Sequence, residues 1–222
     1  GHAAISWLLE FASPLVKVTI VPRGKSLGAA WYLPEERQLS SSNQILDEMC
    51  AALGGRAAEE LIFGQVTTGA LSDLEKVTKQ ARAMVTVYGL NEKLGNITYY
   101  DSSDQNDYQF NKPYSEKTAQ IIDEEISSII ETQYIRAKDL LAANKDKLTS
   151  LANELLEKEV IFKESMEVIF GKRPWTSRMD IVEKSNAVAK PTKQSKAKKA
   201  TKSKKKTASK AGDQDQGTDG DK

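Results

Sequence analysis

Apolar residues recur at helical spacing in three long segments of this 222-residue sequence. The segments are 42–63, 72–88 and 115–143. In each, apolar side chains stand three or four positions apart, which is typical of one buried face of an amphipathic helix. Shorter helices are predicted at 145–157 and 163–170. An apolar helix at 2–13 is expected to end before Pro14, because proline cannot continue a helix.

Local signals refine the ends of these helices. Ser41 with Gln44, and Ser72 with Glu75, have the spacing of capping boxes. The pair Gly54-Gly55 interrupts the apolar face of the 42–63 helix. Two adjacent glycines weaken a helix, but they also allow another backbone to approach closely.

Two segments favour β-strands rather than helices. Residues 15–21 and 27–33 are rich in β-branched and aromatic side chains, and the turn-forming segment 22–26 separates them. A single hairpin is marginal alone, so it should pack on the helices. The predicted fold class is therefore mainly α with one small β-hairpin.

Charge divides the chain into two parts. Residues 184–222 carry 12 Lys and 4 Asp, a balance of +8, whereas residues 1–183 carry 20 basic and 27 acidic side chains, a balance of −7. The segment 184–210 contains no acid and few apolar residues, so we expect it to be disordered. We predict a folded domain over 1–175 and a disordered lysine-rich tail over 176–222. The polar segment 101–113 is predicted to be an exposed loop.

Composition excludes several classes of site. Cys50 is the only cysteine and His2 the only histidine, so neither a disulfide framework nor a histidine-rich metal site can be complete within this chain. A lone cysteine favours a reducing compartment. No run of about 18 apolar residues is present, which argues against a membrane span, and we find no secretory signal.

Two basic features suggest phosphate binding at first sight. Gly24-Lys25-Ser26 follows a predicted strand, but a phosphate loop needs a glycine at position 19, where this chain has Thr, and a helix afterwards. An ordinary turn explains it better. The lysine tail could bind nucleic acid or acidic lipid by charge alone. Residues 184–222 lack arginines and aromatic residues for specific recognition, so we favour a solubilising extension and do not expect a nucleic-acid partner.

Three carboxylates are candidates for chemistry. Glu60 falls inside the apolar stripe of the 42–63 helix, Glu59 points away from it, and Asp73 lies in the first turn of the next helix. The simpler interpretations are a helix N-terminus stabilising Asp73, and a buried Glu60 paired with an arginine or backbone donors. The first residues of the chain make a chemical role for these carboxylates more plausible. Gly1-His2 could remain from cloning, or it could end the zinc-binding motif H-E-x-G-H, whose helix would then begin before residue 1.

Six strings, in order, resemble the peptidase domain of FtsH-type ATP-dependent zinc proteases, peptidase family M41, over about residues 1–172. They are Gly1-His2-Ala3-Ala4, Lys17-Val18-Thr19-Ile20-Val21-Pro22-Arg23-Gly24, Leu33-Pro34-Glu35-Glu36, Leu53-Gly54-Gly55-Arg56-Ala57-Ala58-Glu59-Glu60, Thr67-Thr68-Gly69-Ala70 with Asp73-Leu74, and Met84-Val85-Thr86 with Tyr88-Gly89.

The resemblance implies a zinc site with His2 as the second motif histidine and Asp73 as the distant aspartate ligand. It places the first histidine and the general-base glutamate before Gly1, so no catalytic base is expected within this chain, and the isolated chain should not hydrolyse peptides. The strand at 27–33 resembles the edge on which the family's substrate pairs. The residues concerned are Leu27, Gly28, Ala29, Ala30 and Trp31.

The resemblance also implies a larger protein around this region. FtsH-type proteases are homo-hexamers with an N-terminal membrane anchor and an AAA ATPase module that uses ATP and Mg²⁺. They degrade unfolded or membrane proteins at the cytoplasmic face of the bacterial inner membrane. Two alternatives remain from the sequence: a helical assembly module with a nucleic-acid-binding basic tail, and an inactive relative of the family.

Overall fold

The computed structural model describes residues 1–22, 24, 28–33, 39–100 and 113–175, and the predicted loop at 101–113 and tail at 176–222 fall almost wholly outside them. The elements are α1 (His2–Leu8), β1 (Leu15–Thr19), β2 (Ala29–Tyr32), α2 (Ser42–Phe63), the 3₁₀ turn η1 (Thr68–Ala70), α3 (Leu71–Thr86), α4 (Glu116–Ala143), α5 (Lys145–Lys158), β3 (Val160–Phe162) and α6 (Lys163–Phe170). The mainly α fold class is confirmed.

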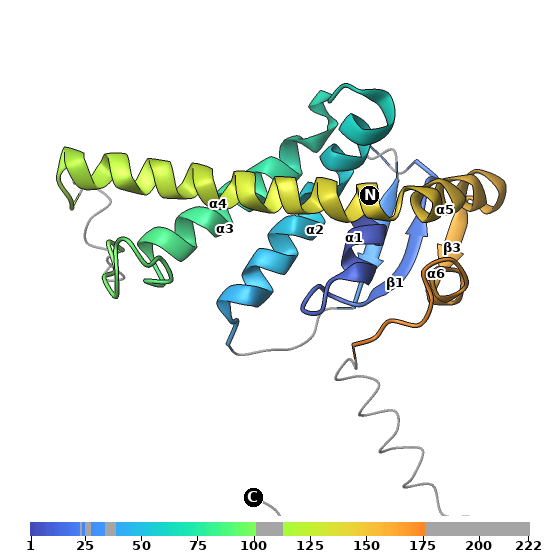
Figure 1. Ribbon diagram of the computed structural model, residues 1–222, viewed down its shortest axis with the longest axis horizontal. Helices are drawn as coiled ribbons and strands as arrows, with labels where there is room; N and C mark the ends of the chain where they lie inside the picture. Colours follow the sequence, from blue (N-terminus) through green and yellow to red (C-terminus); the bar gives the residue numbers. More distant parts are fainter. Residues whose placement is uncertain (23, 25–27, 34–38, 101–112, 176–222) are drawn as a thin grey trace, which may run out of the picture.

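Three helices form one half of the molecule. The long helix α4 lies across α2 and α3 (Figure 1), and the three bury a shared apolar cluster, here called the bundle core. Its buried members are Ile45, Met49, Leu53, Val77, Ala81, Met84, Val85, Ile122 and Ile126. The predicted helical faces supply these side chains.

A small antiparallel sheet forms the other half, in the strand order β2-β1-β3. Val18 of β1 pairs with Ala30 on one side and with Ile161 on the other. The hairpin is as predicted, but β3 was not predicted: it has three residues, lies between two helices, and pairs with a strand far away in the sequence. The sheet packs with α1, α5 and α6 around a second cluster, the sheet core.

Helix α1 is shorter than predicted and ends at Leu8 rather than at residue 13. Tertiary contacts hold the following residues out of the helix. Arg173 donates to the carbonyl oxygens of Leu9 (2.7 Å) and Ala12 (2.6 Å), and the Phe11 amide donates to Asp47 Oδ2 (2.9 Å). These partners lie far away in the sequence, so periodicity could not reveal them.

One of the predicted capping boxes is wrong. Ser41 caps α2 as expected, because its hydroxyl accepts from the Gln44 amide (3.3 Å). Ser72 does not cap α3, which begins at Leu71 without a side-chain cap. Instead, the Thr67 hydroxyl accepts from the Gly69 amide (3.2 Å) and caps η1, which runs directly into α3.

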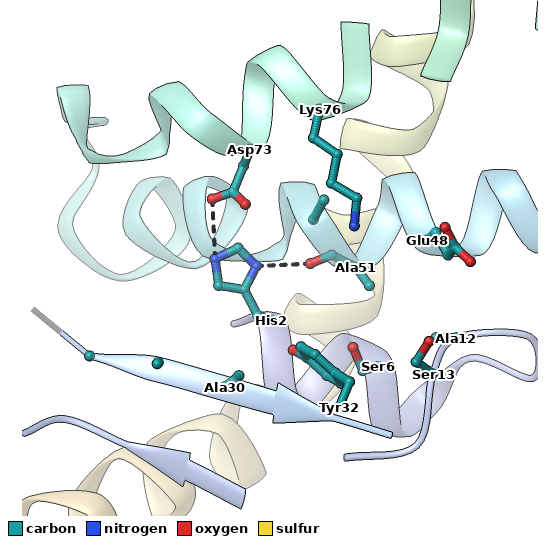
Figure 2. Close-up of a pocket in the computed structure, with 13 residues that line it drawn as sticks. His2, Ser6, Ala12, Ser13, Ala30, Tyr32, Glu48, Ala51, Asp73 and Lys76 are labelled. Atoms are coloured by element: carbon teal, nitrogen blue, oxygen red, sulfur yellow. Dashed lines mark hydrogen bonds and ion pairs between the residues drawn. The ribbon is translucent and has the colours of Figure 1, made fainter. Parts of the chain in front are cut away.

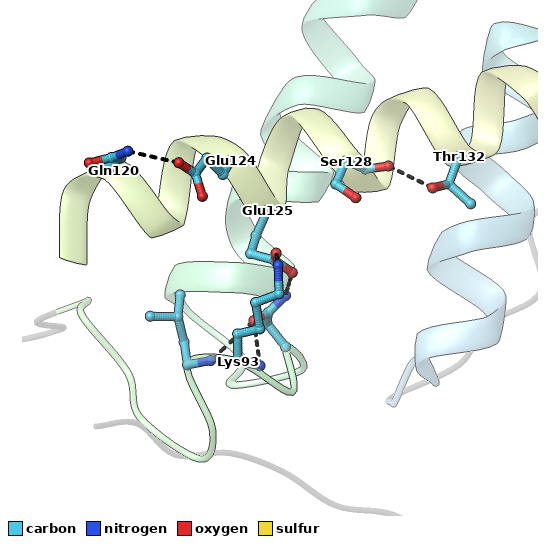
Figure 3. Close-up of polar contacts among 8 residues, drawn as sticks. Lys93, Gln120, Glu124, Glu125, Ser128 and Thr132 are labelled. Carbon is cyan, nitrogen blue, oxygen red and sulfur yellow. Dashed lines mark hydrogen bonds and ion pairs between the residues drawn. The ribbon is translucent and has the colours of Figure 1, made fainter. Parts of the chain in front are cut away.

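Polar contacts fix the chain after α3 onto α4 (Figure 3). Lys93 forms an ion pair with Glu125, and the side-chain amide of Asn91 donates to the same carboxylate (2.7 Å). These hydrogen bonds, that from Lys93 first, hold the pKa of Glu125 below its ordinary value.

In the described part of the chain, none of the helices combines the length and the apolar character needed to cross a membrane.

Candidate functional site

The candidate site begins where α1 crosses α2 at the glycine pair. A Cβ atom on Gly54 would lie 3.0 Å from the main-chain carbon and oxygen of Gly1. A Cβ atom on Gly55 would lie 2.4 Å from Nε2 of His2, inside van der Waals contact. The predicted close approach of another backbone at these glycines is therefore confirmed, and it places the imidazole directly over α2.

One nitrogen of the His2 ring is held by the main chain of α2. Nδ1 lies 3.0 Å from the carbonyl oxygen of Ala51 (Figure 2). Because a carbonyl oxygen only accepts, Nδ1 carries the proton, and in the neutral ring Nε2 then carries the lone pair. This arrangement is the usual support for a metal-binding histidine.

The other nitrogen faces Asp73. Nε2 of His2 lies 3.5 Å from Oδ2 of Asp73, and both side chains are about one-third exposed, at 37% and 33%. A lone pair and a carboxylate oxygen repel one another unless a proton or a cation lies between them. The geometry therefore suits either a protonated imidazole in an ion pair with Asp73 or a cation bound between the two groups.

The turn before α3 brings Asp73 to this position. Glu59 near the end of α2 accepts hydrogen bonds from the amide (3.0 Å) and the hydroxyl (3.1 Å) of Thr67. Thr67 in turn caps η1, so α3 starts beside α2 with Asp73 in its first turn. Glu59 thus helps to place the loop that carries Asp73.

Glu60 lies elsewhere and has other partners. Its carboxylate accepts from Lys138 (2.8 Å) and from the Tyr134 hydroxyl, both on α4. The hydrogen bond from Lys138, followed by that from Tyr134, holds the pKa of Glu60 below its ordinary value. The predicted burial of Glu60 with an arginine or backbone donors is wrong: the side chain is 37% exposed and its partners are a lysine and a tyrosine.

A cleft of about 510 Å³ contains both His2 and Asp73. One wall is formed by β2 with the residue before it, where Gly28, Ala29 and Ala30 leave room because their side chains are small or absent. Of the other predicted edge residues, Trp31 is not among the lining residues, and the Nζ of Lys17 lies 4.5 Å from the centre of its ring. Leu27 lies outside the described residues.

Strand β2 is at an edge of the described sheet, because its order is β2-β1-β3. The candidate metal-binding side chains and the candidate substrate edge thus share one cleft (Figure 2). Sequence reasoning missed five polar residues that also line it, namely Ser6, Ser13, Tyr32, Glu48 and Lys76. Only Lys76 carried a usable signal, since it follows Asp73 by one helical turn.

Comparison with known proteins identifies the family. The model of peptidase family M41 matches residues 1–169, and the chain belongs to this family. It is 59% identical over 194 residues to an ATP-dependent zinc metalloprotease FtsH from Parabacteroides distasonis, covering 86% of this chain and 28% of that relative.

A mitochondrial relative is also similar. The mitochondrial inner membrane m-AAA protease component AFG3L2 from Mus musculus is 48% identical over 178 residues, which is 80% of this chain and 22% of that protein. The chain thus spans about a quarter of the length of these relatives.

The residues present fit a zinc ion in part. Zinc prefers imidazole nitrogen and carboxylate oxygen at about 2.0–2.2 Å, so two ligands of a tetrahedral ion lie about 3.4 Å apart. The 3.5 Å between Nε2 of His2 and Oδ2 of Asp73 agrees with that spacing. Among the described residues, no group of three His, Cys, Asp or Glu side chains could hold a metal. The described residues therefore offer two candidate ligands at this point.

Proposed function

We propose that this chain is the peptidase region of a zinc metalloendopeptidase in which His2 and Asp73 are two of the metal ligands. The observation that carries the proposal is the imidazole lone pair of His2, which the Ala51 carbonyl directs at the Asp73 carboxylate. Membership of peptidase family M41 supports it. The resemblance to the H-E-x-G-H motif assigns the first histidine and the general-base glutamate to residues preceding Gly1 in the longer protein.

Each residue around the site has a defined task in this proposal. The Ala51 carbonyl fixes the tautomer of His2, Gly55 leaves space for its ring, and Glu59 places the turn before Asp73 through Thr67. Zinc, when bound, supplies the Lewis acidity that peptide hydrolysis requires.

The same cleft provides a place for the substrate. An extended peptide can add to β2, the edge strand of the described sheet, as a further antiparallel or parallel strand. The small side chains of Ala29 and Ala30, and the lack of a side chain at Gly28, leave room for a peptide to approach β2. Main-chain pairing does not depend on the peptide's side chains, so broad sequence tolerance follows.

We also infer the setting of this region from its relatives. Their names describe ATP-dependent zinc metalloproteases and an m-AAA protease component. We propose that the whole protein is a membrane-anchored homo-hexamer that unfolds polypeptides with ATP and Mg²⁺ and degrades unfolded or membrane proteins. For a bacterial protein of this kind the cytoplasmic face of the inner membrane is the expected location.

A zinc titration of the 222-residue chain tests the proposed ligands. His2 is the only histidine, so its imidazole resonances in a nuclear magnetic resonance spectrum are assigned without ambiguity. We expect zinc to shift these resonances, and Asp73→Asn to weaken the apparent affinity. Equal affinity in Asp73→Asn, with Glu10→Gln as a control remote from the cleft lining, would contradict the assignment of Asp73.

Hydrolysis provides a second test. The isolated chain should not hydrolyse casein, because in this proposal the first motif histidine and the general-base glutamate are not among its residues. Chelator-sensitive casein hydrolysis by the purified chain would show that this account of the site is wrong.

A further inference from the structure

The cleft has a second polar end that the proposed metal site does not use. Glu48 on α2 and Lys76 on α3 line it, and Lys76 stands between Asp73 and Glu48 in Figure 2, with its side chain extending from α3 toward the cleft. Lys76 is the one lysine or arginine among the described residues that line the cleft.

The two charged groups at this end differ in their partners. Glu48 is held by Gln80, whose Nε2 donates to Oε2 of Glu48 (3.0 Å). In the described part of the chain the Lys76 ammonium forms neither a hydrogen bond nor an ion pair. A lysine ammonium has three donors and no acceptor, so its natural partner is a carboxylate or another anionic group.

Lys76 lies on the wall of the cleft that faces the proposed path of the peptide. Residues three apart on a helix lie on the same face, so Lys76 follows Asp73 along the wall of the cleft. The facing wall is β2, on which the peptide is proposed to lie. A side chain of the peptide that points to α3, close to the bond opposite His2 and Asp73, would therefore meet Lys76.

We propose that Lys76 is a specificity-determining residue that binds a carboxylate of the peptide substrate. This inference rests on the proposed peptidase function. The preference is confined to one position of the peptide, because Glu48 repels a carboxylate placed further along the cleft. An ion pair in a half-open cleft is weakened by solvent, so a preference of about fivefold is expected.

A peptide-binding measurement with the 222-residue chain tests the inference without requiring hydrolysis. Fluorescein-labelled seven-residue peptides, acetylated at the N-terminus and amidated at the C-terminus, carry one Glu at successive positions. Each is compared with its Gln counterpart by fluorescence anisotropy at about physiological salt, where long-range charge effects are screened. A further peptide with no Glu and a free C-terminus tells a terminal carboxylate from a side-chain carboxylate.

We expect one position at which Glu binds about fivefold more tightly than Gln. Lys76→Gln should abolish this ratio and Lys76→Glu should invert it. Lys79→Gln removes the same charge from the same helix. Lys79 is exposed, as Lys76 is, but it lies outside the cleft lining, so the ratio should stay unchanged. Circular dichroism verifies that the variants keep their helices.

Two failures can be told apart. Peptides that bind with the same Glu-to-Gln ratio in the wild-type chain and in Lys76→Gln would overturn the role of Lys76 and leave the peptide-binding cleft intact. Peptides that do not bind at all would contradict the proposed use of β2, and with it the inference about Lys76.

Discussion

Two faces of helix α2 contact their neighbours in different ways. Toward α3 and α4, large side chains such as Met49 and Leu53 fill the bundle core. Toward α1, the contact is made at Gly54 and Gly55, and the fully buried Ala57 belongs to the apolar cluster that includes residues of α1. One face gains stability from buried apolar area, whereas the other face sets how close two backbones lie. The difference shows that the site depends on a small-residue contact that adds little apolar area.

The largest effect on stability is expected from the bundle core. Leu53 is 2% exposed, so Leu53→Ala should lower the free energy of unfolding by about 3 kcal/mol, through lost burial and a cavity. Urea unfolding measures this change. Leu156→Ala is the matched control, because Leu156 is 72% exposed and should change stability by less than about 0.5 kcal/mol. A similar loss in both variants would mean that this core is not the main source of stability.

The glycine contact should respond differently at its two positions. In Gly54→Ala the new methyl meets the backbone of Gly1, and we expect a loss of about 1–2 kcal/mol despite the better helix propensity of alanine. In Gly55→Ala the methyl meets only the His2 ring, which can rotate away. Stability should then stay within about 1 kcal/mol of wild type.

The position of His2 provides the sharper readout for this pair. Gly55→Ala should shift the imidazole resonances and weaken zinc binding while the helix content stays the same. If Gly55→Ala bound zinc as the wild-type chain does, the glycine contact would not set the position of His2.

The smallest effect is expected at Glu60. Hydrogen bonds from Lys138 and Tyr134 lower its pKa, so this group stabilises the folded state above its ordinary pKa near 4.5. That contribution is lost as the pH falls through the lowered value. Glu60→Gln should therefore lower the melting temperature slightly at pH 7, and its stability should fall less than that of wild type on acidification. An unchanged acid dependence of the melting temperature would contradict this role.

Much of the fold could be predicted from periodicity and caps. The bounds of α2 follow from its apolar face and from Ser41, whose hydroxyl accepts from the Gln44 amide, and those of α4 follow from its apolar face. Ser115, which was not predicted to be a cap, accepts from the Thr118 amide. Strand β3 and the end of α1 could not be predicted, because pairing with β1 and the hydrogen bonds from Arg173 decide them. Such contacts join residues far apart and leave no local pattern.

The candidate site could be predicted only in part. Helical periodicity pointed to Glu60 as strongly as to Asp73, and the family resemblance favoured Asp73. The structure brings His2 and Asp73 together, while their role as metal ligands stays a prediction. Glu48 could not be assigned to the cleft, and Lys76 could be placed only one helical turn after Asp73, because a sequence does not show which faces of α2 and α3 oppose β2.

Zinc content of a longer chain, extended upstream through the His-Glu pair of the motif, tests the central claim most directly. The account predicts that Asp73→Asn loses most of its zinc and its peptidase activity with helix content intact. Glu59→Gln and Glu60→Gln should keep their zinc, with Glu60→Gln showing mainly a lower melting temperature. Full zinc occupancy in Asp73→Asn, with loss in Glu59→Gln or Glu60→Gln, would contradict the account and assign the third ligand to that glutamate.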